Sequence, residues 1–371
     1  MHKPTPESPS HSSMILLSRL LLPAAEDRKA PSATRAKLGW ELSNLGRNEF
    51  EDLCMLAQMN HVIVRGLHAF ADVLREERDG LRLQWAHSAI EAEQARIARA
   101  VHFLHEICVA FAEWGLDAMA IKTLDHWPDL GSDLDLYTDA GPEDVAVLMK
   151  SRFHAQIAPR SWGDRLAGKW NFLVPGLPEA VEIHVGRLGQ TGEHVAMAAS
   201  LVEGSRTTTL GGYSFQVPSA SDRLMISTLQ RMYRHFYFRL CDVIDTVALA
   251  DAGGIDYEKL RTLAETAGIW QGVATYLRIV SDYARGYRGA GLEMPPFVAA
   301  AARFGGGEVY FGRGYLRVPI LPQSAWLYGS QLTGLLARGE LQSGARLSLL
   351  PWLATAAVVG QKLTGSDKGI W

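Results

Sequence analysis

The chain has 371 residues, of which 47% are hydrophobic and 21% are charged, and its formal net charge is −3. This length allows two or three packed units with a sizeable core, because domains mostly run to about 100–200 residues. The near-neutral charge excludes a strong overall field that would attract nucleic acid, so a nucleic-acid acceptor would need a local basic face. The cysteines Cys54, Cys108 and Cys241 are too scattered for a disulfide framework or a zinc site, and we interpret them as buried small hydrophobes in a reducing cytosol.

Residues 1–13 are rich in Pro, Ser and His, which predicts a disordered tail. The apolar run Met14–Leu22 is interrupted by Arg19 and is followed by no small-residue cleavage site, so we expect the first amphipathic helix rather than a signal peptide. A second apolar stretch, Leu347–Val359, is shorter than the roughly 20 residues that cross a bilayer. The sequence therefore predicts a cytoplasmic protein without membrane contact.

Residues 14–115 are predicted to form an N-terminal helical region. Its clearest helix runs from Leu83 to Trp114, where apolar residues recur at the 3.6-residue period and Gly115 follows as a stop signal. This pattern is fully explained by packing, and we assign no chemistry to it.

The pattern changes to mixed α/β over residues 116–218. We expect a helix from Pro142 to Phe153, a hairpin that turns at Gly211-Gly212, and strands that lie at Ala118–Lys122, Asp133–Thr138, Trp170–Val174 and Val181–Val185. The predicted fold class is α+β, with a small mixed sheet flanked by helical regions on both sides in the sequence.

Residues 219–290 read as a C-terminal helical domain. Ser219 is a suitable helix start, and one helix is expected to continue through Leu224 to Asp251, with another from Tyr257 to Ala267. Residues 291–371 give a weaker signal and are assigned to an extension of unclear role.

The sharpest local feature is the acidic strand that contains Asp133 and Asp135. Residues two apart on a strand share a face, so these carboxylates repel each other unless a cation lies between them, and oxygen ligands suit Mg²⁺. The alternative is a pair of solvated aspartates on a half-exposed strand. A third acid, Glu182, alternates with apolar residues on a later strand and would complete a two-metal site, although on its own it reads as a surface carboxylate.

Four motifs in this order resemble the polymerase-β-like nucleotidyltransferase superfamily, and more closely a bacterial subfamily found in polysaccharide and modified-peptide gene clusters. That subfamily has an "hLKG" strand end, a "DIDLLV" strand, an "ELHWRL" strand and a helix of the form "H…RL…D". The matching segments here are Ala120–Thr123, Ser132–Tyr137, Val181–Leu188 and His235–Asp242, and the resemblance runs from about residue 14 to 270.

The resemblance implies that Asp133 and Asp135 are metal ligands and that Glu182 is the third acid, which could also accept the acceptor's proton. It also implies a nucleotide-phosphate contact at Lys122-Thr123, where the superfamily usually has Gly-Ser or Gly-Gly. Lys122 could compensate for the lost glycine as a point charge, or it could be a surface lysine at a strand end. Gly131-Ser132 supplies a second flexible turn just before the acids.

A basic helix face is the remaining candidate. Arg231, His235, Arg239 and Asp242 fall at i, i+4, i+8 and i+11 of the expected helix, so they would share one face. That face would bind the triphosphate or an acidic acceptor, with Asp242 orienting Arg239. The alternative is a solvated basic face. His184 is either a site residue or a strand histidine.

The resulting hypothesis is a magnesium-dependent, two-metal nucleotidyltransferase that moves NMP from an NTP, with ATP among the candidates, to an acceptor and releases pyrophosphate. A small molecule or a protein is favoured as the acceptor over a large nucleic acid, and tRNA stays open. The rival hypothesis is a catalytically inactive nucleotide-binding or scaffolding module, which the missing Gly-Ser pair favours.

Overall fold

The computed structural model describes residues 11–24, 33–353, 355, 356 and 359 of the chain. In this part the helices are α1 (His11–Leu21), α2 (Ala33–Ser43), α3 (Arg47–Met59), α4 (Ile63–Glu77), α5 (Gly80–Glu113), α6 (Pro142–Phe153), α7 (Trp162–Ala167), α8 (Val195–Glu203), α9 (Ala220–Thr228), η1 (Leu229–His235), α10 (Leu240–Asp251), α11 (Tyr257–Thr266), α12 (Trp270–Arg288), α13 (Pro296–Ala301), η2 (Gly306–Glu308), η3 (Ile320–Ser324), α14 (Ala325–Ala337) and α15 (Leu341–Ser348). The strands are β1 (Met119–Ala120), β2 (Asp133–Thr138), β3 (Gln156–Ile157), β4 (Lys169–Leu173), β5 (Ala180–Val185), β6 (Arg206–Leu210), β7 (Tyr213–Val217), β8 (Tyr237–Phe238), β9 (Tyr310–Gly312) and β10 (Tyr315–Arg317).

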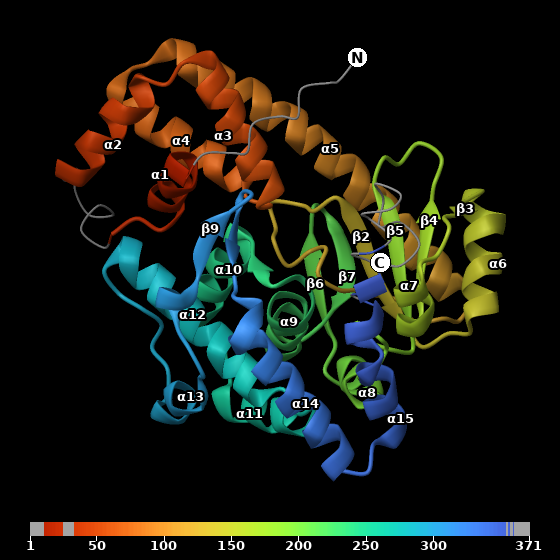
Figure 1. The fold of residues 1–371 in the computed structure, drawn as a ribbon. Coiled ribbons are helices and arrows are strands. Elements are labelled where there is room, and N and C mark those ends of the chain that lie inside the picture. The colour runs from red at the N-terminus through yellow and green to blue at the C-terminus, as the bar shows by residue number, and fades with distance from the viewer. Residues whose placement is uncertain (1–10, 25–32, 354, 357–358, 360–371) are drawn as a thin grey trace.

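The predicted α+β class is confirmed. Figure 1 shows the N-terminal helices at the upper left, the main sheet at the right and the C-terminal helices below. The long helix α5 runs from the N-terminal helices to the sheet, and the Asp79 side chain caps its start by accepting a hydrogen bond of 3.0 Å from the Arg82 backbone N–H. The predicted helix Pro142–Phe153 is α6, and the predicted Gly-Gly turn joins β6 to β7.

Among the described residues, the main sheet has five strands in the order β1-β2-β5-β4-β3. Strands β2 and β5 are parallel and pair in register, with Asp135 opposite Glu182, and the other neighbours are antiparallel. Alternate residues of β2 and β5, such as Leu134 and Ile183, are fully buried in a hydrophobic core shared with α5 and α6. The acids that alternate with them therefore lie on the opposite face of the sheet.

Two hydrophobic cores unite segments that the sequence analysis had separated. The first combines the N-terminal helices with the main sheet and extends to Cys241 at the start of α10. The second combines α9 to α12 with residues from both ends of the chain, including Leu22, Val298 and Leu327. Strand β10 pairs with β8, so the described residues beyond 290 pack into the same body as the preceding helical region.

The expected continuous helix from Leu224 to Asp251 is wrong. Helix α9 passes into the π-helical turn η1, and Phe236 then adopts a left-handed φ of +54° that no helix continues. Tyr237 and Phe238 pair with β10 instead, and Phe238 is fully buried. Burial of this aromatic residue against a strand that is distant in the sequence outweighs the local helical pattern.

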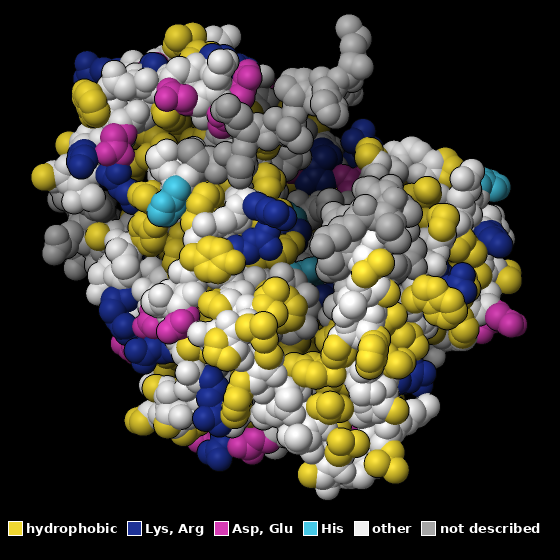
Figure 2. All heavy atoms as spheres, in the orientation of Figure 1, with side chains coloured by type: hydrophobic (Ala, Val, Ile, Leu, Met, Phe, Trp, Pro, Cys, Tyr) yellow, Lys and Arg dark blue, Asp and Glu magenta, His cyan; other side chains and the backbone are white. Residues whose placement is uncertain are grey.

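The ends of the chain differ in part from expectation. His11–Ser13, which were predicted to be disordered, form the first turn of α1, and residues 1–10 lie outside the described part. No described helix combines the length and apolar character needed to cross a membrane. Figure 2 shows hydrophobic side chains gathered at the lower right, over α14 and α15, where Leu336 and Leu341 are exposed.

Candidate active site

The predicted acids converge on one cleft. The in-register pairing of β2 with β5 sets Asp135 beside Glu182, and neighbouring strands lie about 4.8 Å apart. Asp133 precedes Asp135 by two residues on the same face and is exposed at the strand's first position. All three line a cleft that encloses about 710 Å³, open solvent included. The structure thus brings together side chains that are 49 residues apart in the sequence.

Lysine ammonium groups lie among these acids. Lys122 Nζ contacts Asp135 Oδ1 and lies 3.4 Å from Glu182 Oε1. Lys169 Nζ lies 2.6 Å from Glu182 Oε2, and its side chain is almost completely buried. The positive charge that Asp135 and Glu182 need is therefore supplied by the protein itself. Lys122 provides it from just after β1, and Lys169 provides it from the start of β4.

The electrostatic environments of the acids differ. Burial acts to raise the pKa of Glu182, but the positive charges of Lys122 and Lys169 and a hydrogen bond from His184 hold that pKa well below its ordinary value. For Asp133, partial desolvation and then the negative charges of Asp135 and Glu182 raise the pKa. Glu182 is thus a firmly ionised carboxylate, whereas Asp133 takes up a proton more readily than an ordinary aspartate.

The backbone at Lys122 explains why glycine suits this position. Lys122 has a φ of +61°, in the left-handed region that costs a residue with a Cβ about 1–2 kcal/mol. The next residue, Thr123, is buried, and its hydroxyl accepts a 2.6 Å hydrogen bond from the Asp135 backbone N–H. Thr123 also lines the cleft, and its hydroxyl holds the turn against β2, so its contact with a phosphate stays a prediction.

The strain at Lys122 can be measured with a pair of variants. Lys122→Gly and Lys122→Ala both remove the ammonium, but only glycine adopts a positive φ freely. We expect Lys122→Gly to be more stable than Lys122→Ala by about 1 kcal/mol. Urea denaturation of both variants measures the difference, and equal free energies of unfolding would contradict a strained left-handed backbone at this residue.

The other predicted residues of the turn and strand have defined places. His184 Nε2 lies 2.9 Å from Glu182 Oε1 and 3.5 Å from Asp135 Oδ1, so this buried histidine belongs to the acidic cluster. Gly131 and Ser132 line the cleft before β2. A Cβ at Gly131 would lie 2.9 Å from the His61 ring, so a side chain there would displace that ring.

The predicted basic residues also reach the cleft, although they do not share one helix face. His235 ends η1 and Arg239 precedes α10, and both line the same cleft as the acids. Asp242 does not line it. Its carboxylate is buried, lies 2.7 Å from Arg231 Nε and accepts the Arg239 backbone N–H, so the expected role of orienting the Arg239 side chain is replaced by an ion pair with Arg231.

Several residues of the cleft are not predicted from the sequence. Lys169 is the Cα partner of His184 on the neighbouring strand, and Arg234 lies directly before His235. The alternating pattern that begins at Lys169 predicts a strand. The position of Lys169 beside Glu182 depends on the strand order, which the pattern does not predict. His61 and His126 also line the cleft and come from loops that give no pattern.

No known protein family, curated protein or solved structure gives a significant match to this chain.

Proposed function

We propose that this protein is a metal-dependent nucleotidyltransferase that transfers NMP from an NTP to an acceptor hydroxyl. The observation that carries the proposal is the register of β2 and β5, which sets Asp135 beside Glu182 and leaves Asp133 at the mouth of the same cleft. Arg234 and Arg239 line the same cleft, and we call these two residues the basic wall. A basic wall and carboxylates that hold a cation are the two elements that phosphoryl and nucleotidyl transfer require.

The acidic cluster fits a hard divalent cation such as Mg²⁺. One cationic group, the Lys122 ammonium, already contacts Asp135 and lies near Glu182, so the two carboxylates are close enough to share a cation. One oxygen of each lies within 4.8 Å of the other and of a His184 nitrogen. Asp133, Asp135 and Glu182 would hold the metal. When bound, it would neutralise the triphosphate and the leaving pyrophosphate.

The protein's own side chains supply the remaining functions. Glu182 could take the proton from the acceptor hydroxyl, directly or through water. Lys122 has a flexible stem that can move from the acids to a phosphate oxygen. Arg234 and Arg239, the basic wall of the cleft, would hold the triphosphate. A bond forms between the acceptor oxygen and the α-phosphorus, the bond to the bridging oxygen breaks, and pyrophosphate leaves.

A second cavity adjoins the acids and is suited to an apolar group. It encloses about 560 Å³, open solvent included, and shares Lys122, Gln230 and Arg234 with the cleft. Its other walls include Ile121, Leu229 and the C-terminal Leu347. A nucleotide whose phosphates lie in the polar cleft could place its base there, because ligand pockets combine apolar walls with a few fixed polar groups.

The second candidate is a nucleotide-binding module without catalysis. It is favoured by one observation: Lys122 and Lys169 already form ion pairs with Asp135 and Glu182, so two of the three acids have cationic partners without a metal. Such a protein would use the basic wall to bind an NTP and would leave the acids in their ion pairs.

Pyrophosphate release distinguishes the two candidates. The full-length chain is incubated with each of the four NTPs, with Mg²⁺ or with a chelator, and with pooled small-molecule and protein acceptors. We expect pyrophosphate release with at least one NTP, and only with the metal. An NTP that raises the melting temperature without any release of pyrophosphate, under every acceptor condition, would reject the transferase and support the binding module.

A further inference from the structure

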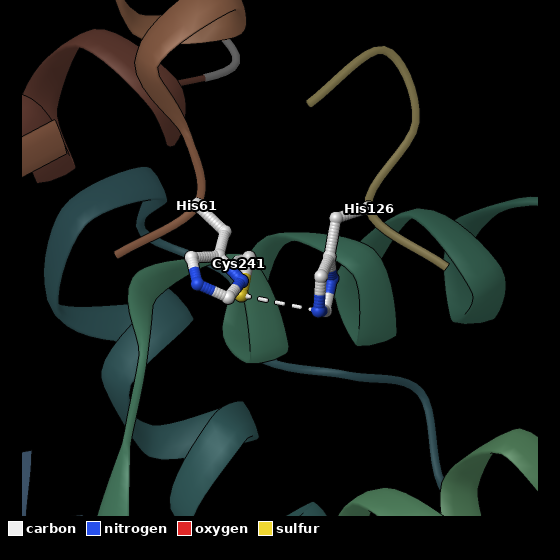
Figure 3. Close-up of side chains that lie close together, drawn as sticks. All are labelled: His61, His126 and Cys241. Atoms are coloured by element: carbon white, nitrogen blue, oxygen red, sulfur yellow. Dashed lines mark hydrogen bonds between the residues drawn. The ribbon is translucent and has the colours of Figure 1, made fainter. Parts of the chain in front are cut away.

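We propose that His61, His126 and Cys241 form a second metal site, selective for a transition metal such as Zn²⁺. Figure 3 shows the three side chains pointing toward one another from two loops and the first turn of α10. One ligand atom of each lies within 4.8 Å of the others. Imidazole and thiolate are the ligands that zinc prefers, whereas Mg²⁺ prefers oxygen. This site is therefore chemically distinct from the acidic cluster, and its existence does not depend on the proposed transferase activity.

The separations are close to those around a zinc ion. Cys241 Sγ lies 3.6 Å from His126 Nε2. In a tetrahedral zinc site, bond lengths of about 2.0–2.3 Å place neighbouring N and S ligands about 3.3–3.6 Å apart. The His61 and His126 rings have centroids 5.5 Å apart, and the Nδ1 atom of His61 is buried without a hydrogen-bond partner among the described residues. A buried nitrogen that lacks a partner favours a missing ligand.

A carboxylate orients His126 as it would orient a metal ligand. His126 Nδ1 lies 2.5 Å from Asp245 Oδ2, so Nε2 is the nitrogen that faces Cys241. Metal-binding histidines commonly bond a carboxylate through the other ring nitrogen, which fixes the tautomer and the ring orientation. Arg65 in turn lies 2.5 Å from the second Asp245 oxygen. Asp245 and Arg65, which lie outside the cluster, thus orient His126 so that its Nε2 atom faces the proposed metal position.

The backbone near His61 is fixed with respect to Cys241. The buried Asn60 accepts hydrogen bonds from the Leu240 and Cys241 backbone N–H groups, through its side chain at 2.9 Å and its carbonyl at 3.2 Å. His61 follows directly with a left-handed φ of +52°, a conformation that is uncommon outside glycine and is often found at functional sites. Asn60 therefore holds two of the three ligands at a set distance before any metal binds.

Two of the three proposed ligands are open to the cleft. His61 and His126 both line the cleft that contains Asp133 and Asp135, whereas Cys241 is fully buried behind them. Three protein ligands and an open position are typical of zinc sites that bind water or substrate. The sequence alone predicts only a buried hydrophobe at Cys241, because its partners lie 180 and 115 residues earlier in the chain.

The same atoms include a Cys241–His126–Asp245 arrangement that resembles a nucleophile, a base and an orienting acid. We favour the metal because a nucleophilic thiol must reach a substrate, and Cys241 has no exposed surface. The third imidazole, His61, has no function in such a triad but completes a metal site.

Cobalt titration of the metal-free, full-length protein tests the proposal. We expect one equivalent of Co²⁺ to bind with a thiolate-to-cobalt charge-transfer band and the visible bands of a tetrahedral site. Cys241→Ser should abolish the charge-transfer band, and Asp245→Asn should weaken binding about 10–100-fold. Cys54→Ser is the matched control, because Cys54 lies outside the cleft, and it should retain the band.

A further variant separates this site from the acidic cluster. Asp135→Asn alters the acidic cluster and should leave the charge-transfer band unchanged, whether or not the protein proves to be a transferase. A band that survives in Cys241→Ser, or no stoichiometric binding by the unmodified protein, would overturn the proposal. Rapid alkylation of Cys241 by iodoacetamide that excess Zn²⁺ does not slow would also overturn it and would favour the nucleophile instead.

Discussion

Replacing Asp135 by asparagine is expected to lower metal-dependent pyrophosphate release by at least about 10²-fold, because metal binding at such a site supplies several kcal/mol of transition-state stabilisation. Asparagine has the shape of aspartate but loses the charge that a metal requires. The backbone N–H that bonds Thr123 is retained in the variant, so the strand should keep its place. The rate is measured with the NTP that gives the fastest release, at saturating Mg²⁺.

The matched control is Asp139→Asn. Asp139 directly follows β2, is exposed and does not line the cleft, so the same chemical change there should leave the rate within about twofold, as for a surface substitution of under about 0.5 kcal/mol. Melting temperatures of both variants show whether the fold is intact. An Asp135→Asn protein that retains the full rate would remove the acidic cluster from the mechanism.

Replacing Arg65 by methionine is expected to destabilise the protein by about 3–5 kcal/mol. Arg65 Nε lies 2.7 Å from Asp129, which is fully buried, and Arg65 Nη1 lies 2.5 Å from Asp245. Methionine retains much of the apolar stem but removes the guanidinium from both carboxylates, so that Asp129 loses its ion pair and Asp245 keeps only His126. Because these ion pairs join α4, the loop before β2 and α10, the loss should appear as a cooperative change in urea unfolding.

Arg75→Met is the control for this prediction. Arg75 lies on the same helix, and its ion pair with Asp72 is mostly exposed, so its loss should cost less than about 1 kcal/mol. If the Arg65 and Arg75 variants lose equal stability, the buried network has no special importance.

The pH dependence of the Arg65 effect has a definite sign. Burial acts to raise the pKa of Asp245, but the charges of Arg65 and His126 lower it below the ordinary value. Stability from this carboxylate is therefore present above the unfolded pKa of about 3.9 and is lost as the pH falls through the lower folded pKa. Without Arg65 the pKa of Asp245 in the folded protein rises. The variant therefore loses less stability than the unmodified protein when the pH falls. The difference between the two proteins should therefore be smaller near the unfolded pKa, at about pH 4, than at about pH 7.

How much of the fold can be predicted depends on how far apart in the sequence the interacting residues lie. The helix α6 and the hairpin of β6 and β7 depend on local signals, Pro142 and Gly211-Gly212, and were predicted with nearly correct bounds. The break after His235 was not predicted, because it depends on β10, which lies about 80 residues later. The residues around His235 therefore give no indication of the pairing between β8 and β10.

The candidate site divides in the same way. Asp133, Asp135 and Glu182 were found because period-two alternation assigns each to a strand face, and the structure brings them together in one cleft. The ion pair between Lys169 and Glu182 forms because β4 is the neighbour of β5 in the sheet. No motif in the sequence specifies that strand order. The His61, His126 and Cys241 cluster joins three parts of the chain through tertiary packing alone. Site residues that strand alternation places on one face can be predicted from the sequence. Site residues that only tertiary packing brings together cannot.

The pairing of β2 with β5 has a consequence for how the chain tolerates insertions. A residue added within either strand would turn the following side chains to the opposite face, so Asp135 or Glu182 would point into the apolar layer and Leu136 or Ile183 would face solvent. A residue added in the loops between the strands would leave both orientations unchanged. Length variation among natural or designed versions of this protein should therefore be confined to the connections and absent from the two hexapeptides themselves.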